Sequence, residues 1–424
     1  MNETKNSNKS LDCKRSVSQG ALTRRRFCAD MITASAAAAF GAGLPASAGA
    51  SSKVETERRI KIGIVGLGGR GKWIAGLFKA HGGYELAAAA DYFEAVVQKQ
   101  GEQLGVPATK RFSGLSGYKR VLDTGVEALV IEDVPCFYPE QASAAVEAGR
   151  HVYVAKPIAV DVPGVRAMEA AANKATAKKL CFLVDYQLPT DAGNQEVAKR
   201  VRDGALGTLA HIYSGGLSSR WTDPERESTI ENLLRGGAWL SHVNLGGDNI
   251  VSYDIHIVDG VTWVMDKCPL GACGISRAVE KHHGDRTDCG GVVFQYDDGM
   301  FWTHITQALK NNAWIYNLAA DFMGVRATAH VAYWGKIHIR GGPQHYAGSV
   351  SAGIYEDGAK TNIAEFYRCI TGGDFSNPTA RRAVEGTLTA ILGREAMARK
   401  TFLTKDELIR ENKKLKVDLR GLKT

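Results

Sequence analysis

Apolar and polar positions in the first half of the chain follow two alternating periods. Short apolar, β-branched runs predict strands at 60–65, 84–90, 128–131, 151–154 and 180–184. Amphipathic stretches of helical period lie between them, at 70–80, 93–104, 139–148 and 162–177. Strands that alternate with helices in this way are typical of a doubly wound parallel sheet with helices on both faces. We therefore predict an α/β domain over residues 58–186.

The pattern changes after a further helix expected at 194–203. Long strands without helices between them are predicted at 208–217, 290–296, 300–307, 317–323 and 336–340. Asp297, Asp298 and Gly299 favour a tight hairpin turn, because glycine accepts the positive φ that such a turn requires. Helices return at 361–369 and 381–398. We predict an α+β domain over 187–400 with a large, open, mostly antiparallel sheet, followed by a peripheral charged tail at 401–424.

Residues 1–48 have the features of a twin-arginine signal peptide. A Thr-Arg-Arg-Arg-Phe step at 23–27 precedes a weakly apolar run at 31–44 and an Ala-Ser-Ala cleavage site at 46–48. The apolar run is rich in Ala and Gly and is shorter than the ~20 strongly apolar residues that a spanning helix needs. We therefore expect a periplasmic or otherwise exported protein, with no membrane association after the leader is cleaved.

Composition narrows the classes of partner. The leader holds seven Lys or Arg and three Asp or Glu, which accounts for four of the net charge of +8 and leaves +4 for the rest. A balance this close to neutral, without a basic stripe, is not typical of nucleic-acid binding. Six cysteines follow the leader, but no Cys-x-x-Cys pair or Cys/His cluster has the spacing of a zinc site. We expect no metal and no nucleic-acid partner.

A glycine-rich turn follows the first predicted strand and opens the first predicted helix. Gly66 permits the tight turn, Gly68 lets the backbone approach a pyrophosphate, and Gly71 allows close packing of helix on strand. The helix N-terminus offers free N–H groups to the phosphates, and Gly69 and Arg70 lie in this turn. This is the dinucleotide-binding fingerprint of a Rossmann domain.

The preferred cofactor follows from the next strand. Asp91 stands twenty residues after Gly71, at the end of the second predicted strand. A carboxylate there accepts hydrogen bonds from the adenosine ribose and repels a 2′-phosphate, which favours NAD over NADP. The expected export of a folded chain implies that NAD binds before export and stays tightly bound afterwards.

A Lys156-Pro157 step follows the strand predicted at 151–154, where strand ends of a doubly wound sheet meet the nicotinamide. Together with other short motifs it resembles the Gfo/Idh/MocA family of sugar and polyol oxidoreductases, over residues 58–400. The further matches are Pro135, the helix start Pro139-Glu140-Gln141-Ala142, the turn from Gly204 to Gly207, and Asn377-Pro378-Thr379.

The resemblance implies roles for several residues. Lys156 and His256 are expected to be catalytic, with Lys156 taking the proton of the reacting hydroxyl. Burial beside bound NAD lowers the pKa of a lysine toward neutrality, as a general base requires. Pro135, Tyr138 and Lys156 are expected at the cofactor. Gln187, Trp239, Asp254 and His256 are the expected substrate contacts.

Three positions depart from the family's pattern. Ala155 replaces the glutamate that precedes the lysine, and Tyr138 stands where the cofactor loop often has histidine. Aligning His256 and Asp259 on the family's His-x-x-Asp places Ser252 at the position of an expected carboxylate. A glycine-led regular helix would put Ser252 and His256 on one face and turn Asp254 away from His256.

These features predict an NAD-dependent oxidoreductase that oxidises a sugar or glycoside hydroxyl, with the 3-hydroxyl as the expected position. One alternative is a redox-neutral, NAD-dependent glycoside hydrolase, although a Thr-His-Gly-Leu-Gly-Pro segment of such relatives is missing from 252–259. A second alternative is a non-catalytic sugar-binding protein, which Ala155 and Ser252 favour and Lys156 and His256 oppose. The family's open sheet often forms subunit interfaces, which implies a homo-oligomer.

Export provides a first test. Replacing Arg24 and Arg25 by Lys (R24K with R25K) should keep the precursor in the cytoplasm, because the arginine pair identifies the leader. The mature chain should begin near Gly49, which N-terminal sequencing of the exported protein checks. Mature protein that still appears outside the cytoplasm after both replacements would contradict the predicted leader.

Overall fold

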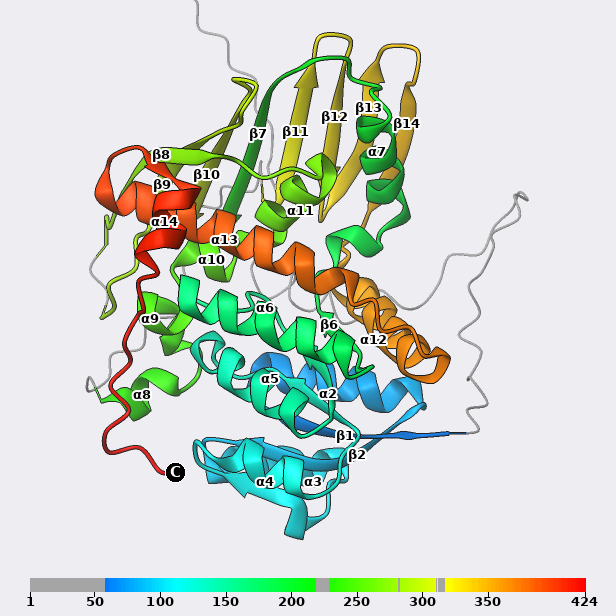
Figure 1. Cartoon of the computed structure of the whole chain (residues 1–424), viewed down its shortest axis with the longest axis vertical. Coiled ribbons are helices and arrows are strands. Elements are labelled where there is room, and N and C mark those ends of the chain that lie inside the picture. Colours follow the sequence, from blue (N-terminus) through cyan, green and yellow to red (C-terminus); the bar gives the residue numbers. More distant parts are fainter. Residues whose placement is uncertain (1–57, 219–228, 281–282, 310, 312–316) are drawn as a thin grey trace, which may run out of the picture. The chain divides into compact units, whose positions relative to one another are not determined.

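The computed structural model describes residues 58–218, 229–280, 283–309, 311 and 317–424. The predicted leader at 1–48 lies outside these residues. Two sheets dominate the described chain, and both belong to one compact unit (Figure 1). The predicted boundary at residue 186 falls between the last strand of the first sheet and the first helix of the second half.

The first sheet has six strands, all parallel, in the order β3-β2-β1-β4-β5-β6. This is the Rossmann strand order, and it confirms the predicted doubly wound sheet. The strands are β1 (Ile60–Val65), β2 (Tyr84–Asp91), β3 (Arg111–Ser113), β4 (Ala128–Ile131), β5 (His151–Val154) and β6 (Phe182–Val184). The helices that alternate with them are α2 (Gly69–His81), α3 (Glu94–Leu104), α4 (Gly117–Asp123), α5 (Tyr138–Glu147) and α6 (Val162–Ala177).

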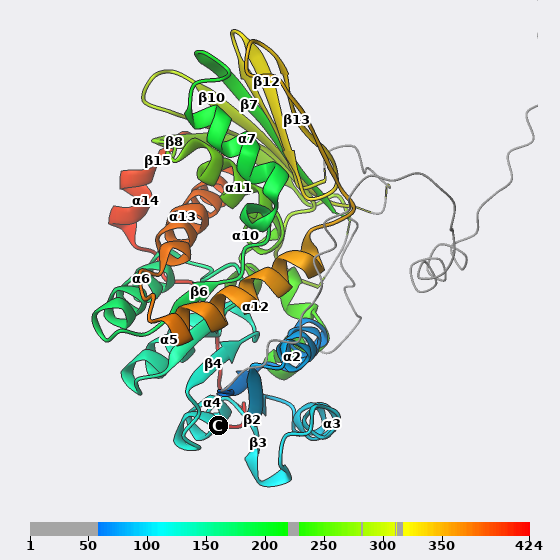
Figure 2. The same cartoon turned by 90° about the vertical axis from the view of Figure 1, so that its right-hand side faces the viewer.

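Two apolar cores lie on opposite faces of this sheet. One core unites residues of β1 and β2 with α2, α3 and a helix from late in the chain, α12 (Tyr355–Gly372). Figure 2 shows α12 beside α2. The hydroxyl of Tyr84 in β2 donates a hydrogen bond to the Ile363 carbonyl of α12, which lies 279 residues later in the chain. The other core unites α4, α5 and α6 and continues into the second half of the chain. The C-terminal helices therefore fix the two sheets to each other.

The second sheet has nine strands in the order β14-β13-β12-β11-β7-β10-β9-β8-β15. Among its described pairs β7 and β10 are parallel and the others are antiparallel, as predicted. The strands are β7 (Leu209–Ser218), β8 (Gly271–Arg277), β9 (Cys289–Gln295), β10 (Phe301–Ala308), β11 (Ala319–Gly324), β12 (Ala327–Ala332), β13 (Gly335–Gly341), β14 (Tyr346–Ser351) and β15 (Leu403–Thr404).

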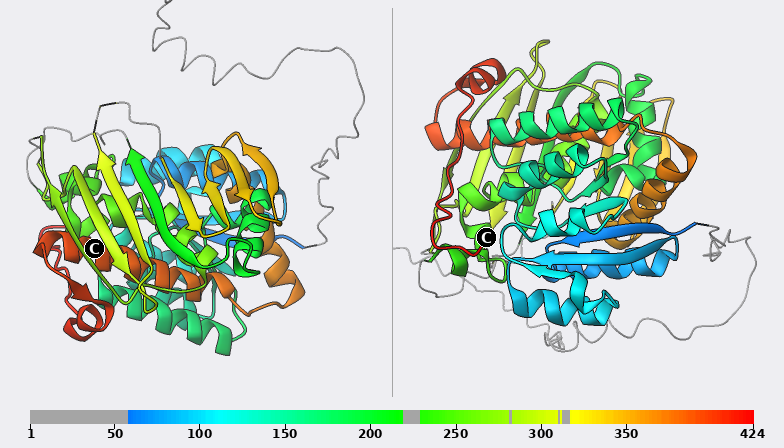
Figure 3. Two further views of the ribbon diagram at one scale, coloured as in Figure 1. Left: turned by 90° about the horizontal axis from the view of Figure 1, so that it is seen from above. Right: turned by 60° about the horizontal axis from the view of Figure 1, so that its bottom comes forward.

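Helices cover one face of the second sheet (Figure 3, left). The helices of this half, besides α12, are α7 (Ala192–Arg202), α8 (Ile230–Leu234), α9 (Val243–Gly246), α10 (Asn249–Ser252), α11 (Ile255–Met265), α13 (Pro378–Arg399) and α14 (Lys405–Glu411). Strand β10 alternates buried and accessible residues, which is typical of a sheet with one packed face. No described helix is long and apolar enough to cross a bilayer.

Several elements were missed by the sequence patterns. Strands β3 and β15 are too short for a period, while β8 and β14 contain small residues that carry little β signal. The tail predicted to be peripheral instead adds β15 to the edge of the sheet beside β8. Its last residues then reach the first sheet, where the Leu115 N–H donates to the Lys423 carbonyl at 2.9 Å.

Candidate active site

The glycine-rich turn after β1 has the geometry that the fingerprint requires. Gly66 has a φ of +85°, and a Cβ there would lie 2.6 Å from the backbone nitrogen of Asp133. A Cβ on Gly71 would lie 1.8 Å from the Gly66 carbonyl oxygen. Gly68 and Gly69, in contrast, have open space where a side chain would stand. The turn thus closes tightly on the protein side and leaves room on the pocket side, which fits a bound pyrophosphate.

Asp91 ends β2 at the rim of the same pocket. Its Oδ2 accepts a hydrogen bond from the Leu67 N–H at 2.8 Å, and its Oδ1 accepts one from the Phe93 N–H at 2.9 Å. Burial raises the pKa of this carboxyl, and the two backbone donors oppose that effect. The glycine-rich turn and Asp91 are therefore joined directly, and two backbone donors hold the carboxylate at the pocket.

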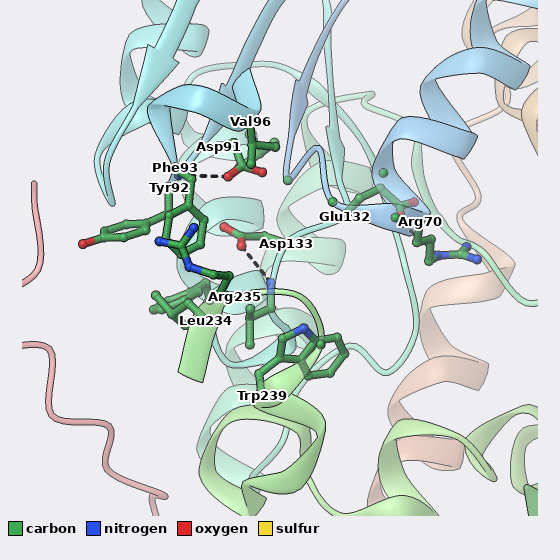
Figure 4. A pocket seen from close by; sticks show the side chains of 18 of the residues that line it. Arg70, Asp91, Tyr92, Phe93, Val96, Glu132, Asp133, Leu234, Arg235 and Trp239 are labelled. Atoms are coloured by element: carbon green, nitrogen blue, oxygen red, sulfur yellow. Dashed lines mark hydrogen bonds and ion pairs between the residues drawn. The ribbon is translucent and has the colours of Figure 1, made fainter. Parts of the chain in front are cut away.

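The pocket has a volume of about 760 Å³ and draws its walls from both halves of the chain (Figure 4). The Rossmann strand ends form one side, and α8, α12 and the segment from α10 to Tyr253 form others. A pocket of this size lies in the usual range for cofactor sites. The predicted site residues that line it are Gly66, Gly68, Gly69, Arg70, Gly71, Asp91, Lys156 and Trp239.

Five predicted site residues do not line the pocket. Pro135 and Tyr138 are buried, whereas their neighbours Val134 and Phe137 line the wall in their place. Pro135 opens a 3₁₀ turn and Tyr138 opens α5, and in each case the residue immediately before it forms the pocket wall. The other three are the predicted substrate contacts Gln187, Asp254 and His256.

Lys156 follows β5 and faces the pocket. Its Nζ donates a hydrogen bond to the Ser252 carbonyl at 3.0 Å, so α10 of the second half orients it. Burial, followed by the positive charge of Arg70, lowers the pKa of Lys156 to about 7. An amine with this pKa is partly neutral at physiological pH and can accept a proton from a hydroxyl.

His256 lies in α11 and has no exposed surface. Its Nε2 is 2.8 Å from the Tyr355 hydroxyl, and its Nδ1 is 2.7 Å from the Tyr333 hydroxyl. Burial lowers the pKa of His256 well below its ordinary value, and the charges of Lys156 and Arg70 add to this effect. The imidazole is therefore neutral, with one nitrogen donating to a tyrosine and the other accepting from one. Of these three residues, Tyr355 lines the pocket.

The predicted regular helix around His256 is broken. Helix α10 ends at Ser252, and Asp254 caps the start of α11, so Ser252 and His256 lie on separate helices. Asp254 accepts a hydrogen bond from His304 Nε2 at 3.0 Å and is fully buried. A Cβ on Gly216 of β7 would lie 2.0 Å from Asp254 Oδ1. Asp254 therefore anchors α11 to β7 and β10 and does not line the pocket.

A buried charged cluster stands beside Lys156 and was missed by the sequence patterns. Arg70 Nε lies 2.8 Å from Glu132 Oε2, and the same guanidinium pairs with Asp185. Asp185 also accepts from Gln187 Nε2 and from Asn362 Nδ2, each at 2.8 Å. Gln187, predicted to bind substrate, thus orients a carboxylate of this cluster.

Glu132 supplies a carboxylate near the position left without one by Ala155. It directly follows β4, and Ile131 of β4 pairs with Val154 of β5, immediately before Ala155. Burial raises the pKa of Glu132 to about 7, while Arg70 opposes the rise. Its Oε1 has no hydrogen-bond partner among the described residues. The sequence signal that could have identified Glu132 is an acidic residue directly after a buried strand.

The described residues contain no cluster of His, Cys, Asp or Glu that could hold a metal ion.

Comparison with known proteins supports the Rossmann assignment. Residues 60–184 match the model of the GFO_IDH_MocA oxidoreductase family, described as an NAD-binding Rossmann fold. This match agrees with the resemblance seen in the sequence and confirms NAD as the expected cofactor.

Two curated proteins show distant similarity. A 1,5-anhydro-D-fructose reductase of Ensifer adhaerens is 23% identical over 229 residues, which are 53% of this chain and 62% of the relative. A glycosyl hydrolase family 109 protein of Solibacter usitatus (strain Ellin6076) is 26% identical over 257 residues, which are 56% of this chain and 55% of the relative. The chain thus spans less than two thirds of the length of either relative.

Solved structures share the fold over most of the chain. Aldose-aldose oxidoreductase from Caulobacter crescentus, complexed with glycerol, has a TM-score of 0.66 at 19% identity, covering 82% of this chain and 100% of that one. Scyllo-inositol dehydrogenase from Lactobacillus casei, with NAD(H) and scyllo-inositol, has a TM-score of 0.63 at 18% identity, covering the same shares. At these identities the likeness is one of fold, and it confirms the predicted fold class.

The role of Asp91 can be tested by cofactor preference. Asp91→Asn keeps an acceptor for a backbone N–H but removes the charge that repels a 2′-phosphate. The preference for NAD over NADP should fall by about 1–3 kcal/mol, the scale of a hydrogen bond to a charged group. Titration of the apoprotein with each nucleotide measures the change. Equal affinity of the unaltered protein for NAD and NADP would refute the assigned role.

Proposed function

We propose that this protein is an NAD-dependent oxidoreductase that oxidises a hydroxyl group of a sugar or glycoside, with the 3-hydroxyl as the expected position. The observation that carries the proposal is Lys156, an amine with a pKa of about 7 in the pocket that contains the dinucleotide cradle. The match of residues 60–184 to an oxidoreductase family and the names of distant relatives support it. The cofactor remains bound between turnovers in this proposal.

The chemistry divides between the cofactor and the pocket. NAD, when bound, supplies the acceptor for the hydride that leaves the carbon of the reacting hydroxyl. Lys156 takes the hydroxyl proton, because its amine is partly neutral and the Ser252 carbonyl holds Nζ at the pocket wall. The substrate carbon thus loses a hydride and its oxygen loses a proton, which leaves a carbonyl.

Tyr355 is the group through which His256 acts on the substrate. Tyr355 lines the pocket and its hydroxyl meets His256 Nε2, while Tyr333 holds the opposite ring nitrogen. Tyr333 also donates to Gln187 Oε1 at 3.5 Å, which extends the chain of polar groups toward Asp185. We assign to Tyr355 the orientation of the reacting hydroxyl toward Lys156, and to His256 the positioning of Tyr355.

Trp239 provides the expected platform for a sugar ring. It lines the pocket and is half-buried, and an aromatic face can stack on the apolar side of a pyranose.

The face of the nine-stranded sheet that no described helix covers carries exposed Ile275, Val293 and Phe301, which supports the proposal of a homo-oligomer. Export through the twin-arginine pathway remains part of the proposal.

A redox-neutral glycoside hydrolase is the second candidate, because the Solibacter usitatus relative is named as a glycosyl hydrolase. The non-catalytic alternative is opposed by Lys156, whose amine, with its pKa lowered to about 7, lies in a cofactor-sized pocket. Mass spectrometry of sugars and glycosides incubated with the purified protein separates the three. Loss of two hydrogens supports the oxidoreductase, release of the aglycone supports the hydrolase, and an unchanged panel rejects both.

The rate of sugar oxidation should rise with pH through about 7 and level off above it. Only the neutral amine of Lys156 accepts a proton, and the neutral form dominates above the pKa of about 7. The kcat/KM profile measures this limb, which also reports on Glu132, because the charges of Lys156 and Glu132 influence each other's pKa. Glu132→Gln should move the limb to lower pH, because Glu132 raises the pKa of Lys156. A pH limb that Glu132→Gln leaves unmoved would contradict this arrangement.

Lys156→Ala should lower the rate of sugar oxidation roughly 10²–10⁴-fold or more, because the proposed base is removed.

Tyr355→Phe and His256→Ala should lower kcat to a similar extent, and the double variant should be little slower than either. Both changes break one polar chain, so their effects should not add. NAD affinity, measured by titration, should remain close to that of the unaltered protein. If Tyr355→Phe retained full activity while His256→Ala did not, His256 would act on the substrate by another route.

A further inference from the structure

One end of the pocket is walled by residues from outside the Rossmann domain. Asp91, which meets the adenosine ribose of a bound dinucleotide, identifies this end. Tyr92 and Phe93 follow it, with ring centroids 4.9 Å apart and ring planes at 90°. Arg235, at the end of α8, places its guanidinium carbon 4.2 Å from the centroid of the Phe93 ring. Figure 4 shows Arg235 lying against Phe93, with Leu234 beside it.

The C-terminal segment fastens this wall from outside. Residues 415–424 run from α14 along the molecule to the first sheet (Figure 3, right). The Leu415 N–H donates to Asp161 Oδ2 at 2.8 Å, and the Lys416 carbonyl accepts from Asn244 Nδ2 at 3.0 Å. Beyond these, the Lys423 N–H donates to the Tyr92 hydroxyl at 3.3 Å.

Apolar packing joins the same parts. Leu234 and Val134 form a small buried cluster, against which Val417 and Leu422 of the tail pack together with Phe93. This cluster is separate from the two large cores of the sheets. The wall formed by α8 is therefore held to the Rossmann domain by the tail as well as by its own contacts.

We propose that Phe93, Leu234 and Arg235 form an adenine-binding clamp, and that residues 415–424 hold the clamp closed around the cofactor. A planar guanidinium stacked on an aromatic ring offers flat surfaces of the kind on which a nucleobase stacks. The proposal rests on the NAD dependence proposed above and explains how the chain retains its cofactor. In this proposal α8 and the tail slow the release of a dinucleotide seated here.

Binding of half-cofactors tests the clamp. Arg235→Ala should weaken the binding of AMP, which carries the adenosine half, about two- to fivefold, the scale of one exposed cation–π contact. The binding of nicotinamide mononucleotide should stay unchanged, because Lys156 and the glycine-rich turn lie elsewhere. Phe93→Leu, which keeps the apolar volume but removes the ring, should have the same selective effect. Equal weakening of both ligands, or no weakening of AMP, would overturn the clamp.

The rate of NAD release tests the tail. Removal of residues 417–424 from the otherwise complete protein should speed the exchange of bound NAD for isotopically labelled NAD at least about tenfold, the effect of losing ~1.4 kcal/mol. Arg420→Ala is the matched control, because the Arg420 side chain is 91% exposed and pairs with Asp418 of the same segment. It should leave the rate unchanged. Unaltered release from the shortened chain would overturn the role of the tail.

The two proposals fail in different ways. If the purified protein binds NAD but oxidises no sugar, the proposed function fails while the clamp stands on the AMP and release data. If the protein oxidises sugars but neither variant changes AMP binding or NAD release, the clamp fails and the function stands.

Discussion

The site depends on one largely buried cation, the Arg70 guanidinium, whose side chain is 27% exposed. It sits between Glu132 and Asp185, whose side chains have no exposed surface, and these carboxylates raise the pKa of Arg70 further above its usual range. Breaking a buried pair of this kind typically costs about 3–5 kcal/mol, because an uncompensated charge is left behind. Since Arg70 belongs to α2, the pair fixes the phosphate-binding helix to the ends of β4 and β6. The same charge lowers the pKa of Lys156, so the glycine-rich turn and the proposed base depend on one side chain.

The polar chain from Tyr355 to Asp185 shows how the second half of the protein completes this site. Tyr355, His256 and Tyr333 come from α12, α11 and the end of β12, and they meet only because the nine-stranded sheet packs its helices toward the Rossmann domain. A neutral histidine held by two hydroxyls transmits a proton without gaining a net charge. Because His256 is buried, it can pass a proton between the two tyrosines, but it cannot contact solvent or substrate directly.

Sequence patterns predicted the features that depend on local chemistry. The glycines of the first turn, Asp91 and Lys156 were found because backbone conformation or position after a strand limits the residue type there. The alternation of strands with helices and the two kinds of sheet followed from periodicity. Tyr355 could not be found in this way, because 99 residues separate it from His256. The break between α10 and α11 was missed, although Asp254, at the N-cap position of α11, is of a residue type that favours the start of a helix.

Helix α12 bears on both halves of the site. Tyr355 stands in its first turn and meets His256, and Asn362 stands seven residues later, on the same side after two turns, and meets Asp185. A rigid helix keeps such a spacing constant, so α12 fixes the distance between the Tyr355 hydroxyl, to which we assign the orientation of the substrate, and the carboxylate that balances Arg70. A change in pitch or tilt of this one element would alter the proton path and the charge balance together. The contacts of His256 and of Asp185 are therefore coupled through the position of this single helix.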